Sequence, residues 1–398
     1  MHCTKKIKDD LVWVGGNDRR LELFEGVYEV PEGISYNAYL LKDEKNVLFD
    51  TVDKAVSEVF FENLRHELKD GGLDYIIVQH MEPDHSATLA GAAEMYPSAK
   101  IVCSVRCAEF IKQFFDFELD SRLITVGEGD TLETGKHLLR FITAPMVHWP
   151  EVIVTYDERE KILFSADAFG IFGAQQGGIF ADTVDFESEC MDEARRYFAN
   201  IVGKYGPQTA ALLKKTAALE IRLICPLHGY VFRRDFDSLI SKYMSWASYI
   251  PEQKGVLICY ASVYGNTQNA AEAVAAQLAE MGVQTRIMDV SKSPASQIIA
   301  MSFKYSHLVF ASVTYNSGAF VTMEAVLHDM AAHNLQNRTI AFIQNGTWAP
   351  GAEKSMKKIL EGLKNCSFIE PSLTVKSALH DTDFAKVRDF AGAIYKTL

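Results

Sequence analysis

The feature that most constrains this chain is a group of potential metal ligands at the expected end of a strand. The sequence His80-Met81-Glu82-Pro83-Asp84-His85 directly follows the apolar run Tyr75-Ile76-Ile77-Val78. A short apolar run rich in β-branched and aromatic residues is typical of a buried strand. The imidazole and carboxylate donors lie close together directly after this strand. This pattern predicts a fold in which residues at the ends of strands form a metal site.

Three further donor residues follow strand-like runs in the same way. They are His148 after 138–142, Asp167 after 162–164, and His228 after 221–226. In layered α/β folds the carboxyl ends of the strands open on one crevice, so residues distant in sequence can meet there. A solvated loop is the alternative for any single histidine or acid, but the matching contexts of the whole set favour a shared site.

The ligand types indicate which metal such a site would hold. Four imidazoles and three carboxylates are too many for one tetrahedral ion. Two ions fit better, because two-metal sites hold their ions about 3.5–4 Å apart and a carboxylate such as Asp167 can bridge that distance. Glu82 stands where a zinc site is expected to hold another imidazole, and carboxylates favour iron or manganese. Each ion would keep an open position for substrate.

The chain is long enough for two domains, and its pattern changes near Pro251-Glu252. We therefore predict an α/β domain over residues 1–251 and a second domain over 252–398. The first contains strand-like runs at 36–41 and 46–50 and a predicted helix over 56–69. The segment 169–180, rich in Gly, Phe and Ile, follows Asp167 and either lines the site or forms a buried loop without a function.

The second domain begins with a strand-like run at 255–260 and a loop suited to phosphate. The loop leads into a helix with apolar residues at helical spacing, Ala270, Val274, Leu278 and Met281. Free N–H groups at a helix amino terminus can hold phosphate without Lys or Arg. Neither a dinucleotide nor a triphosphate motif is present, so FMN is the better fit. The predicted contact residues are Ser262, Val263, Tyr264, Gly265, Asn266 and Thr267.

Two more polar loops follow the strand-like runs at 307–311 and 339–343. Their predicted flavin-contacting residues are Thr314, Tyr315, Asn316, Ser317 and Gly318 in one loop, and Asn345, Gly346, Thr347 and Trp348 in the other. In a doubly wound sheet such loops lie beside the point where strand order reverses, which is where a ligand binds. The three loops are therefore expected to surround one flavin site.

The chain resembles the flavodiiron proteins over nearly its whole length. The resemblance is carried by the hexapeptide 80–85, His148-Trp149-Pro150, Asp167 and His228, and by the flavodoxin-like half that follows them. The resemblance implies a metallo-β-lactamase-like αββα sandwich followed by a flavodoxin-like, doubly wound, parallel five-stranded sheet. It implies that His80, Glu82 and His148 hold one iron, that Asp84, His85 and His228 hold the other, and that Asp167 bridges them. Family members differ at the His85 position, so its iron contact is a prediction. Tyr315 and Trp348 would cover the flavin ring. Val313, where a proline is frequent, and the sequence of the third loop depart from the family pattern.

The implied activity is reduction of O2 to water, of NO to N2O, or of both. Water formation from O2 takes four electrons, which a diferrous pair and a reduced flavin can share, and this requires both cofactors. The sequence has no Cys-x-x-Cys pair for a fused rubredoxin, so we expect a separate donor such as a rubredoxin or a reduced-cofactor oxidoreductase. The resemblance also implies a head-to-tail homodimer.

The charge and the hydropathy pattern limit the other partners. The net charge of −12 argues against a nucleic-acid or anionic-membrane surface. No signal peptide or membrane-length apolar run is present, so a cytoplasmic protein is expected.

Two other functions remain open at this point. One is a zinc hydrolase of the metallo-β-lactamase type with a flavodoxin-like appendage, although Glu82 and Asp84 disfavour zinc. The other is an FMN electron carrier whose first domain has lost its metal, although the complete ligand set disfavours such a loss.

Overall fold

The computed structural model describes residues 1–116 and 119–398. The chain divides into two compact units, one of Met1–Phe198 with Pro207–Tyr243 and the other of Ala199–Gly206 with Met244–Leu398. A domain boundary at 251/252 stays a prediction. Among the described residues, no helix combines the length and apolar character needed to cross a bilayer.

The first unit contains two larger β-sheets. One has the strand order β1 (Lys5–Lys6), β2 (Leu11–Trp13), β7 (Tyr39–Leu41), β8 (Val47–Phe49), β9 (Tyr75–Val78), β10 (Lys100–Ser104) and β11 (Leu123–Val126). The other has the order β12 (Thr131–Glu133), β13 (Leu138–Thr143), β14 (Ile153–Asp157), β15 (Ile162–Phe164) and β16 (Leu223–Cys225). Strands β8 to β11 are parallel, as are β15 and β16. Two small antiparallel pairs are β3 (Gly16–Asp18) with β6 (Ile34–Tyr36) and β4 (Leu23–Phe24) with β5 (Tyr28–Glu29).

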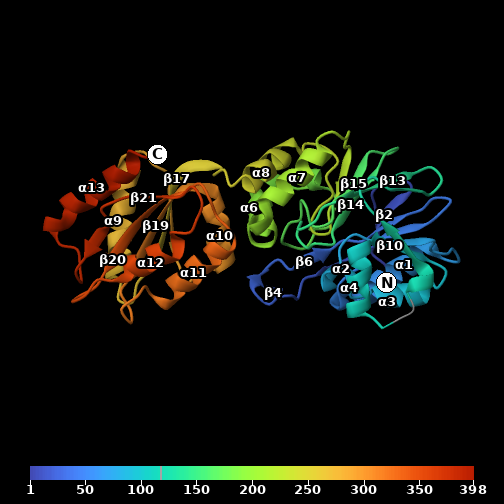
Figure 1. The fold of residues 1–398 in the computed structure, drawn as a ribbon, viewed down its shortest axis with the longest axis horizontal. Coiled ribbons are helices and arrows are strands. Elements are labelled where there is room, and N and C mark those ends of the chain that lie inside the picture. Colours follow the sequence, from blue (N-terminus) through green and yellow to red (C-terminus); the bar gives the residue numbers. More distant parts are fainter. Residues whose placement is uncertain (117–118) are drawn as a thin grey trace. The chain divides into compact units, whose positions relative to one another are not determined.

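Alternate residues of these strands form the core between the two sheets. Val47, Phe49 and Ile77 from one sheet and Phe141 and Phe164 from the other belong to the same buried cluster. Because side chains alternate along a strand, the opposite faces are left for helices, which Figure 1 shows flanking the sheets. The helices of this region are α1 (Ser57–Leu68), α2 (Pro83–Ser86), α3 (Leu89–Met95), α4 (Val105–Phe114), α5 (Phe186–Glu189), α6 (Met191–Tyr197), α7 (Gly206–Thr216) and α8 (Asp237–Ala247). The result is the metallo-β-lactamase-like αββα sandwich that the family resemblance implied.

The second unit is built on one parallel sheet. Its order is β18 (Thr285–Asp289), β17 (Gln253–Ala261), β19 (Tyr305–Val313) and β20 (Thr339–Asn345), with both β21 (Ser367–Phe368) and β22 (Leu373–Val375) paired to β20. Strand order reverses between β17 and β19, as in a doubly wound flavodoxin-like fold. The predicted fifth strand is present as two short pieces, because Pro371 lies between them and cannot donate to the ladder.

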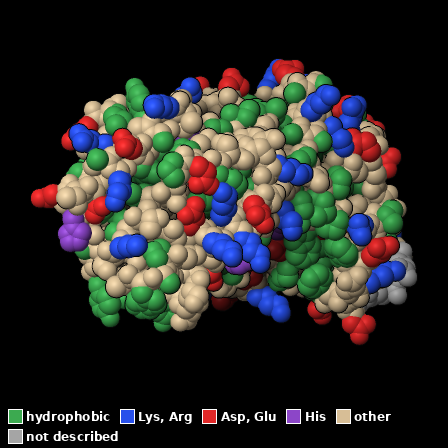
Figure 2. Space-filling view, turned by 60° about the vertical axis from the view of Figure 1, so that its left-hand side comes forward, with side chains coloured by type: hydrophobic (Ala, Val, Ile, Leu, Met, Phe, Trp, Pro, Cys, Tyr) green, Lys and Arg blue, Asp and Glu red, His purple; other side chains and the backbone are tan. Residues whose placement is uncertain are grey.

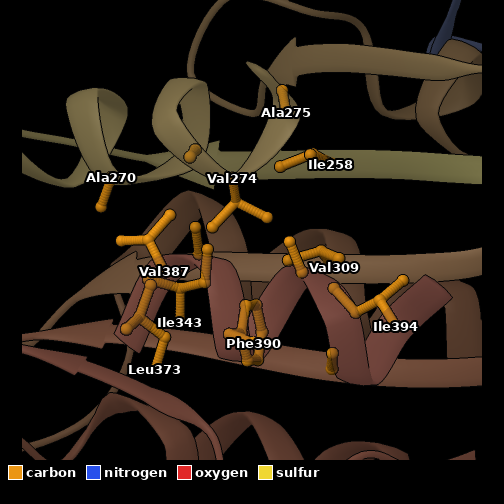
Figure 3. Close-up of a cluster of buried hydrophobic side chains, with 14 of the residues drawn as sticks. Ile258, Ala270, Val274, Ala275, Val309, Ile343, Leu373, Val387, Phe390 and Ile394 are labelled. Atoms are coloured by element: carbon orange, nitrogen blue, oxygen red, sulfur yellow. The ribbon is translucent and has the colours of Figure 1, made fainter. Parts of the chain in front are cut away.

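Helices cover both faces of this sheet (Figure 1). On one face α9 (Asn266–Glu280) and α13 (Phe384–Tyr395) pack together, and on the other lie α10 (Ala295–Lys304), α11 (Val321–Ala332) and α12 (Ala352–Leu360). Figure 3 shows the core beneath α9 and α13, where Val274, Phe390 and Ile394 meet the sheet residues Ile258 and Val309.

The predicted apolar face of α9 is confirmed except at its end. Ala270, Val274 and Leu278 are buried, whereas Met281 lies beyond the last helical residue and is 36% exposed. The helix ends before Met281 because the chain turns at Gly282, which has a φ of +77°, and helices commonly end at such a glycine.

Charged side chains of both signs are interspersed over the face of the molecule shown in Figure 2. Hydrophobic side chains are also visible between them. This face therefore does not present charge of a single sign.

Candidate metal centre and flavin loops

The seven predicted ligands all meet in the first unit. His80 follows β9, Glu82 precedes α2, and Asp84 and His85 lie on the first turn of that helix. His148 lies between β13 and β14, and Asp167 and His228 follow β15 and β16. Their donor atoms form two groups, each within 4.8 Å: His80, Glu82, His148 and Asp167 in one, and Asp84, His85 and His228 in the other.

We call the trio His80, Glu82 and His148 the His80 site, and the trio Asp84, His85 and His228 the His228 site. In the His80 site, Nε2 of His148 lies 2.8 Å from Oε2 of Glu82, and Nε2 of His80 lies 3.3 Å from the same oxygen. In the His228 site, Oδ2 of Asp84 lies 3.1 Å from Nε2 of both histidines. Each site therefore joins two imidazoles and one carboxylate.

Asp167 lies between the two sites. Its Oδ2 is 3.1 Å from Nε2 of His80 and 3.4 Å from Nε2 of His148, whereas its Oδ1 is 3.3 Å from Nε2 of His85 and 3.8 Å from Nε2 of His228. One oxygen thus faces each site, which is the arrangement that a bridging carboxylate requires.

Several donor atoms of this cluster are buried and form no hydrogen bond within the described part of the chain. They include both oxygens of Asp84 and both oxygens of Asp167. Burying a charged oxygen without a hydrogen bond is costly, and such groups commonly bind a metal. The Nε2 atoms of His85 and His228 also face each other at 3.0 Å. The donor set therefore fits a pair of cations.

The electrostatics of the cluster favour positive charge at its centre. Burial alone would lower the pKa values of His85 and His148, but the surrounding carboxylates raise the pKa of His85 to about 10 and that of His148 to about 9. Burial raises the pKa of Asp167, but His80 and the other imidazoles outweigh it and hold that pKa well below its usual value. A metal cation and the imidazole protons thus compete for one negatively charged centre.

Residues outside the predicted set hold these ligands in place. Asp50, which follows β8, accepts hydrogen bonds from both nitrogens of Gln79, at 2.7 and 2.9 Å, and from the backbone N–H of His80. His228 donates from Nδ1 to the backbone carbonyl of Ser35 at 2.7 Å. Asp50 shares the strand-end signature that identified Asp167, so the sequence contained a usable signal for it.

Glu25 was also missed. It lies in the turn between β4 and β5 with a φ of +51°. Glu25 is exposed, but desolvation of its carboxyl by neighbouring atoms, followed by repulsion from Glu82, raises the pKa of Glu25 to about 8. An acid in a β-turn carries no sequence signal that would connect it with a distant metal cluster.

The segment 169–180 contributes to the aromatic surroundings of His228. The rings of Phe24 and Tyr197 lie 5.5 and 5.4 Å from that of His228, and Phe172 packs against both, at 5.8 and 5.1 Å. Phe172 thus packs against the two rings that contact His228. The segment 169–180 therefore contributes to the packing around the cluster.

In the second unit, the three predicted loops follow the adjacent parallel strands β17, β19 and β20 and share one edge of the sheet. The second and third loops are joined directly: the Thr314 N–H donates to the Asn345 carbonyl at 2.7 Å, and the Gly351 N–H donates to the Thr314 hydroxyl at 3.0 Å. A Cβ on Gly346 would lie 2.8 Å from Cα of Pro350, so only glycine fits there.

The first loop ends at an open helix terminus. Gly265, with a φ of +91°, precedes α9, and no side chain of the described residues caps this helix. The hydroxyl of Ser262 accepts a hydrogen bond from the Gly265 N–H at 3.1 Å. The earliest helical bond of α9 runs from the Asn269 N–H to the Gly265 carbonyl. The amides before Asn269 are thus placed to hold a phosphate.

The loop side chains divide into exposed and buried groups. Tyr264 and Trp348 are more than 90% exposed and Tyr315 is 48% exposed, which suits residues that would lie against a flat ring. Asn345 is buried instead, and its amide is hydrogen bonded to the backbone of Ser377. Asn345 therefore shapes the third loop. The sequence analysis did not identify Ser377.

Comparison with known proteins agrees with this architecture. Residues 34–229 match the ODP family beta lactamase model, and residues 258–388 match the flavodoxin model. An uncharacterized protein of Methanocaldococcus jannaschii is 32% identical over 97% of this chain and 96% of its own length. The anaerobic nitric oxide reductase flavorubredoxin of Aeromonas hydrophila subsp. hydrophila is 30% identical over 87% of this chain and 70% of its own length.

Two solved structures superpose on nearly the whole chain. The rubredoxin oxygen:oxidoreductase of Desulfovibrio gigas has a TM-score of 0.93 and 28% identity, and covers 99% of this chain and 98% of its own. The flavodiiron protein of Giardia intestinalis has a TM-score of 0.92 and 26% identity, with 99% and 97% covered.

Proposed function

Because this chain belongs to the flavodiiron protein family, we propose that it is an oxidoreductase that reduces O2 to water, NO to N2O, or both. The observation that carries the proposal is the placement of Asp167, which presents one oxygen to each of two histidine–carboxylate sites. Curated relatives named as nitric oxide reductases and a structural neighbour named as an oxygen oxidoreductase support the two substrates.

The residues of the cluster would hold two iron ions. The His80 site would bind one ion, the His228 site the other, and Asp167 would bridge them. Three carboxylates in the set favour iron over zinc, because anionic oxygen ligands suit harder and redox-active ions. The buried surroundings of Asp84 and Asp167 limit the approach of water, so the ligands supply a fixed and negatively charged frame for the ions.

The loops of the second unit would hold FMN. The amides at the start of α9 would bind its phosphate, and Tyr315 and Trp348 would lie against its ring. When bound, FMN and the iron pair supply the electron storage that reduction of either gas requires. The protein itself positions these groups and keeps the two metal positions adjacent.

We further propose that electrons come from a separate donor, such as a rubredoxin or a reduced-cofactor oxidoreductase, and that the active form is a head-to-tail homodimer. Flavin and iron would be held in different units of one chain, and in such a dimer the flavin of one subunit would face the iron pair of its partner. An active monomer in equilibrium sedimentation at assay concentration would contradict the dimer.

The test is rapid mixing of the anaerobically reduced, iron- and FMN-loaded protein with O2 and, separately, with NO. We expect flavin and iron absorbance to return to the oxidised state with at least one gas and product to form in proportion, and the relative rates would assign the preference. A protein that binds two zinc ions, hydrolyses a thioester or lactam and consumes neither gas would overturn the proposal.

A further inference from the structure

Glu151 is a buried carboxylate that lies directly behind one of the proposed metal ligands. Its Oε1 accepts hydrogen bonds from Nδ1 of His80 at 2.8 Å and from the backbone N–H of Met81 at 2.9 Å. The side chains of Glu151 and His80 are both fully buried. The second oxygen of Glu151 has no hydrogen-bond partner among the described residues.

Two features fix Glu151 independently of the His80 ring. The Met81 N–H holds its carboxylate, and the hydroxyl of Ser104 donates to its backbone carbonyl at 2.8 Å. With the proton of His80 held on Nδ1, the lone pair of Nε2 is left for a metal. That Nε2 atom lies 3.1 Å from Oδ2 of Asp167, inside the donor group.

In the His228 site, no carboxylate among the described residues accepts a hydrogen bond from an imidazole Nδ1, and Asp50 interacts with His85 only through its charge. Nδ1 of His228 donates to a neutral group, the Ser35 carbonyl, and Nδ1 of His85 is buried without a hydrogen bond to any residue that the structure describes. The two sites therefore have similar direct ligands but different groups behind their imidazoles. An imidazole that donates to a carboxylate is a stronger ligand than one that donates to a neutral carbonyl.

Building on the proposed function, we propose that Glu151 is a positioning residue that makes the two ions inequivalent. It aims Nε2 of His80 at the metal and adds negative charge behind the His80 site. Nearby negative charge stabilises the more highly charged state of an ion. The iron held by His80, Glu82 and His148 is therefore oxidised at a lower potential than its neighbour.

The experiment compares Glu151→Gln and Glu151→Ala with the wild-type chain, all loaded with iron anaerobically. Glutamine keeps an oxygen that can accept both hydrogen bonds but removes the charge, whereas alanine removes both. We measure iron bound per chain and the two midpoint potentials by redox titration followed by electron paramagnetic resonance. Glu151→Gln should keep both ions and raise the lower potential, and Glu151→Ala should bind one ion about 10- to 100-fold more weakly.

Asp157→Asn is the matched control. Asp157 is another buried carboxylate that accepts from an imidazole Nδ1, that of His137 at 2.5 Å, and neither residue belongs to the donor groups. This variant should leave both potentials unchanged. If Glu151→Ala does not fold, the midpoint potentials of Glu151→Gln alone test the inference. Unchanged potentials in an iron-loaded Glu151→Gln chain would overturn the inference alone, whereas a wild-type chain that holds no iron pair would overturn the proposed function as well.

Discussion

The metal cluster and the flavin loops both lie where strands end, but they are constructed differently. The cluster consists of side chains, most of them buried, whose donor atoms lie within 4.8 Å of one another in each of two groups. The loops consist largely of backbone, with free amides at α9, a glycine that admits no side chain and aromatic side chains in solvent. Loss of one side chain should therefore be severe in the cluster, whereas the loops should be sensitive mainly to changes in their backbone path.

The largest effect is expected for Asp167→Asn. The amide cannot bridge two cations as a carboxylate does. The iron affinity of both sites should therefore fall by more than the roughly 100-fold that is typical when a residue behind a metal ligand is removed. Gas reduction should fall with the iron content, whereas the FMN content should not change. Iron and flavin assays on one preparation check this prediction, with Asp157→Asn as the control that keeps its iron. Full iron occupancy in Asp167→Asn would contradict the bridging role.

Gly346→Ala should produce the reverse pattern. The added Cβ would meet Cα of Pro350 at 2.8 Å, and overpacking of this kind costs about 1–3 kcal/mol. We expect FMN binding to weaken by about 10- to 100-fold while iron binding is retained. Gly362→Ala is the control, because a Cβ at that position meets nothing within 4 Å. Equal FMN dissociation constants for the two variants, measured by fluorescence titration, would show that this close approach does not shape the site.

Trp348→Ala should have a smaller effect. Trp348 is 91% exposed, so its removal should leave the thermal unfolding midpoint of the apoprotein unchanged. Loss of ring stacking, worth about 0.5–1.5 kcal/mol, should weaken FMN binding by only about two- to tenfold. The exposed Tyr395, which lies on α13 outside the loops, provides the control variant Tyr395→Ala. The same loss of affinity in both variants would argue against stacking.

The smallest effect is expected from a buried pair outside the cluster. Burial lowers the pKa of His137, but the hydrogen bond to Asp157 outweighs it and the folded-state pKa is raised. A raised pKa stabilises the fold below the unfolded value of about 6.5, and this stability is lost as pH rises through the folded value. The difference in unfolding free energy between wild type and His137→Gln should therefore shrink as pH rises. Urea titrations of both proteins across this pH range provide the test. A difference in unfolding free energy that does not change with pH would refute the contribution of the His137–Asp157 pair.

The same contrast explains what could be predicted from the sequence. The cluster was accessible because ligand-type residues followed recognisable strands, and the structure brings all seven of them together. Asp50 carried the same signature and was missed, whereas the hydrogen bond between Glu151 and His80 is a contact that no spacing reveals. The break at Asn37-Ala38 within the predicted run 36–41 arises because Asn37 turns inward to bond with Trp13 and Pro226.

The loops could be placed but not resolved from the sequence. Parallel strands ending in small polar residues indicated the correct edge of the sheet. Which side chains point outward depends on contacts with distant segments, such as the bond from Asn345 to Ser377. Residue type alone could not show that Asn345 is buried and Trp348 exposed, and therefore which of the two is available to contact a flavin.

The most direct test of this account is the metal content of protein reconstituted anaerobically with iron, measured together with flavin content. We predict two iron ions and one FMN per chain, with the Mössbauer spectrum of an exchange-coupled iron pair. A mononuclear iron site, a stable pair of zinc ions that iron cannot replace, or a chain that retains no metal would contradict it.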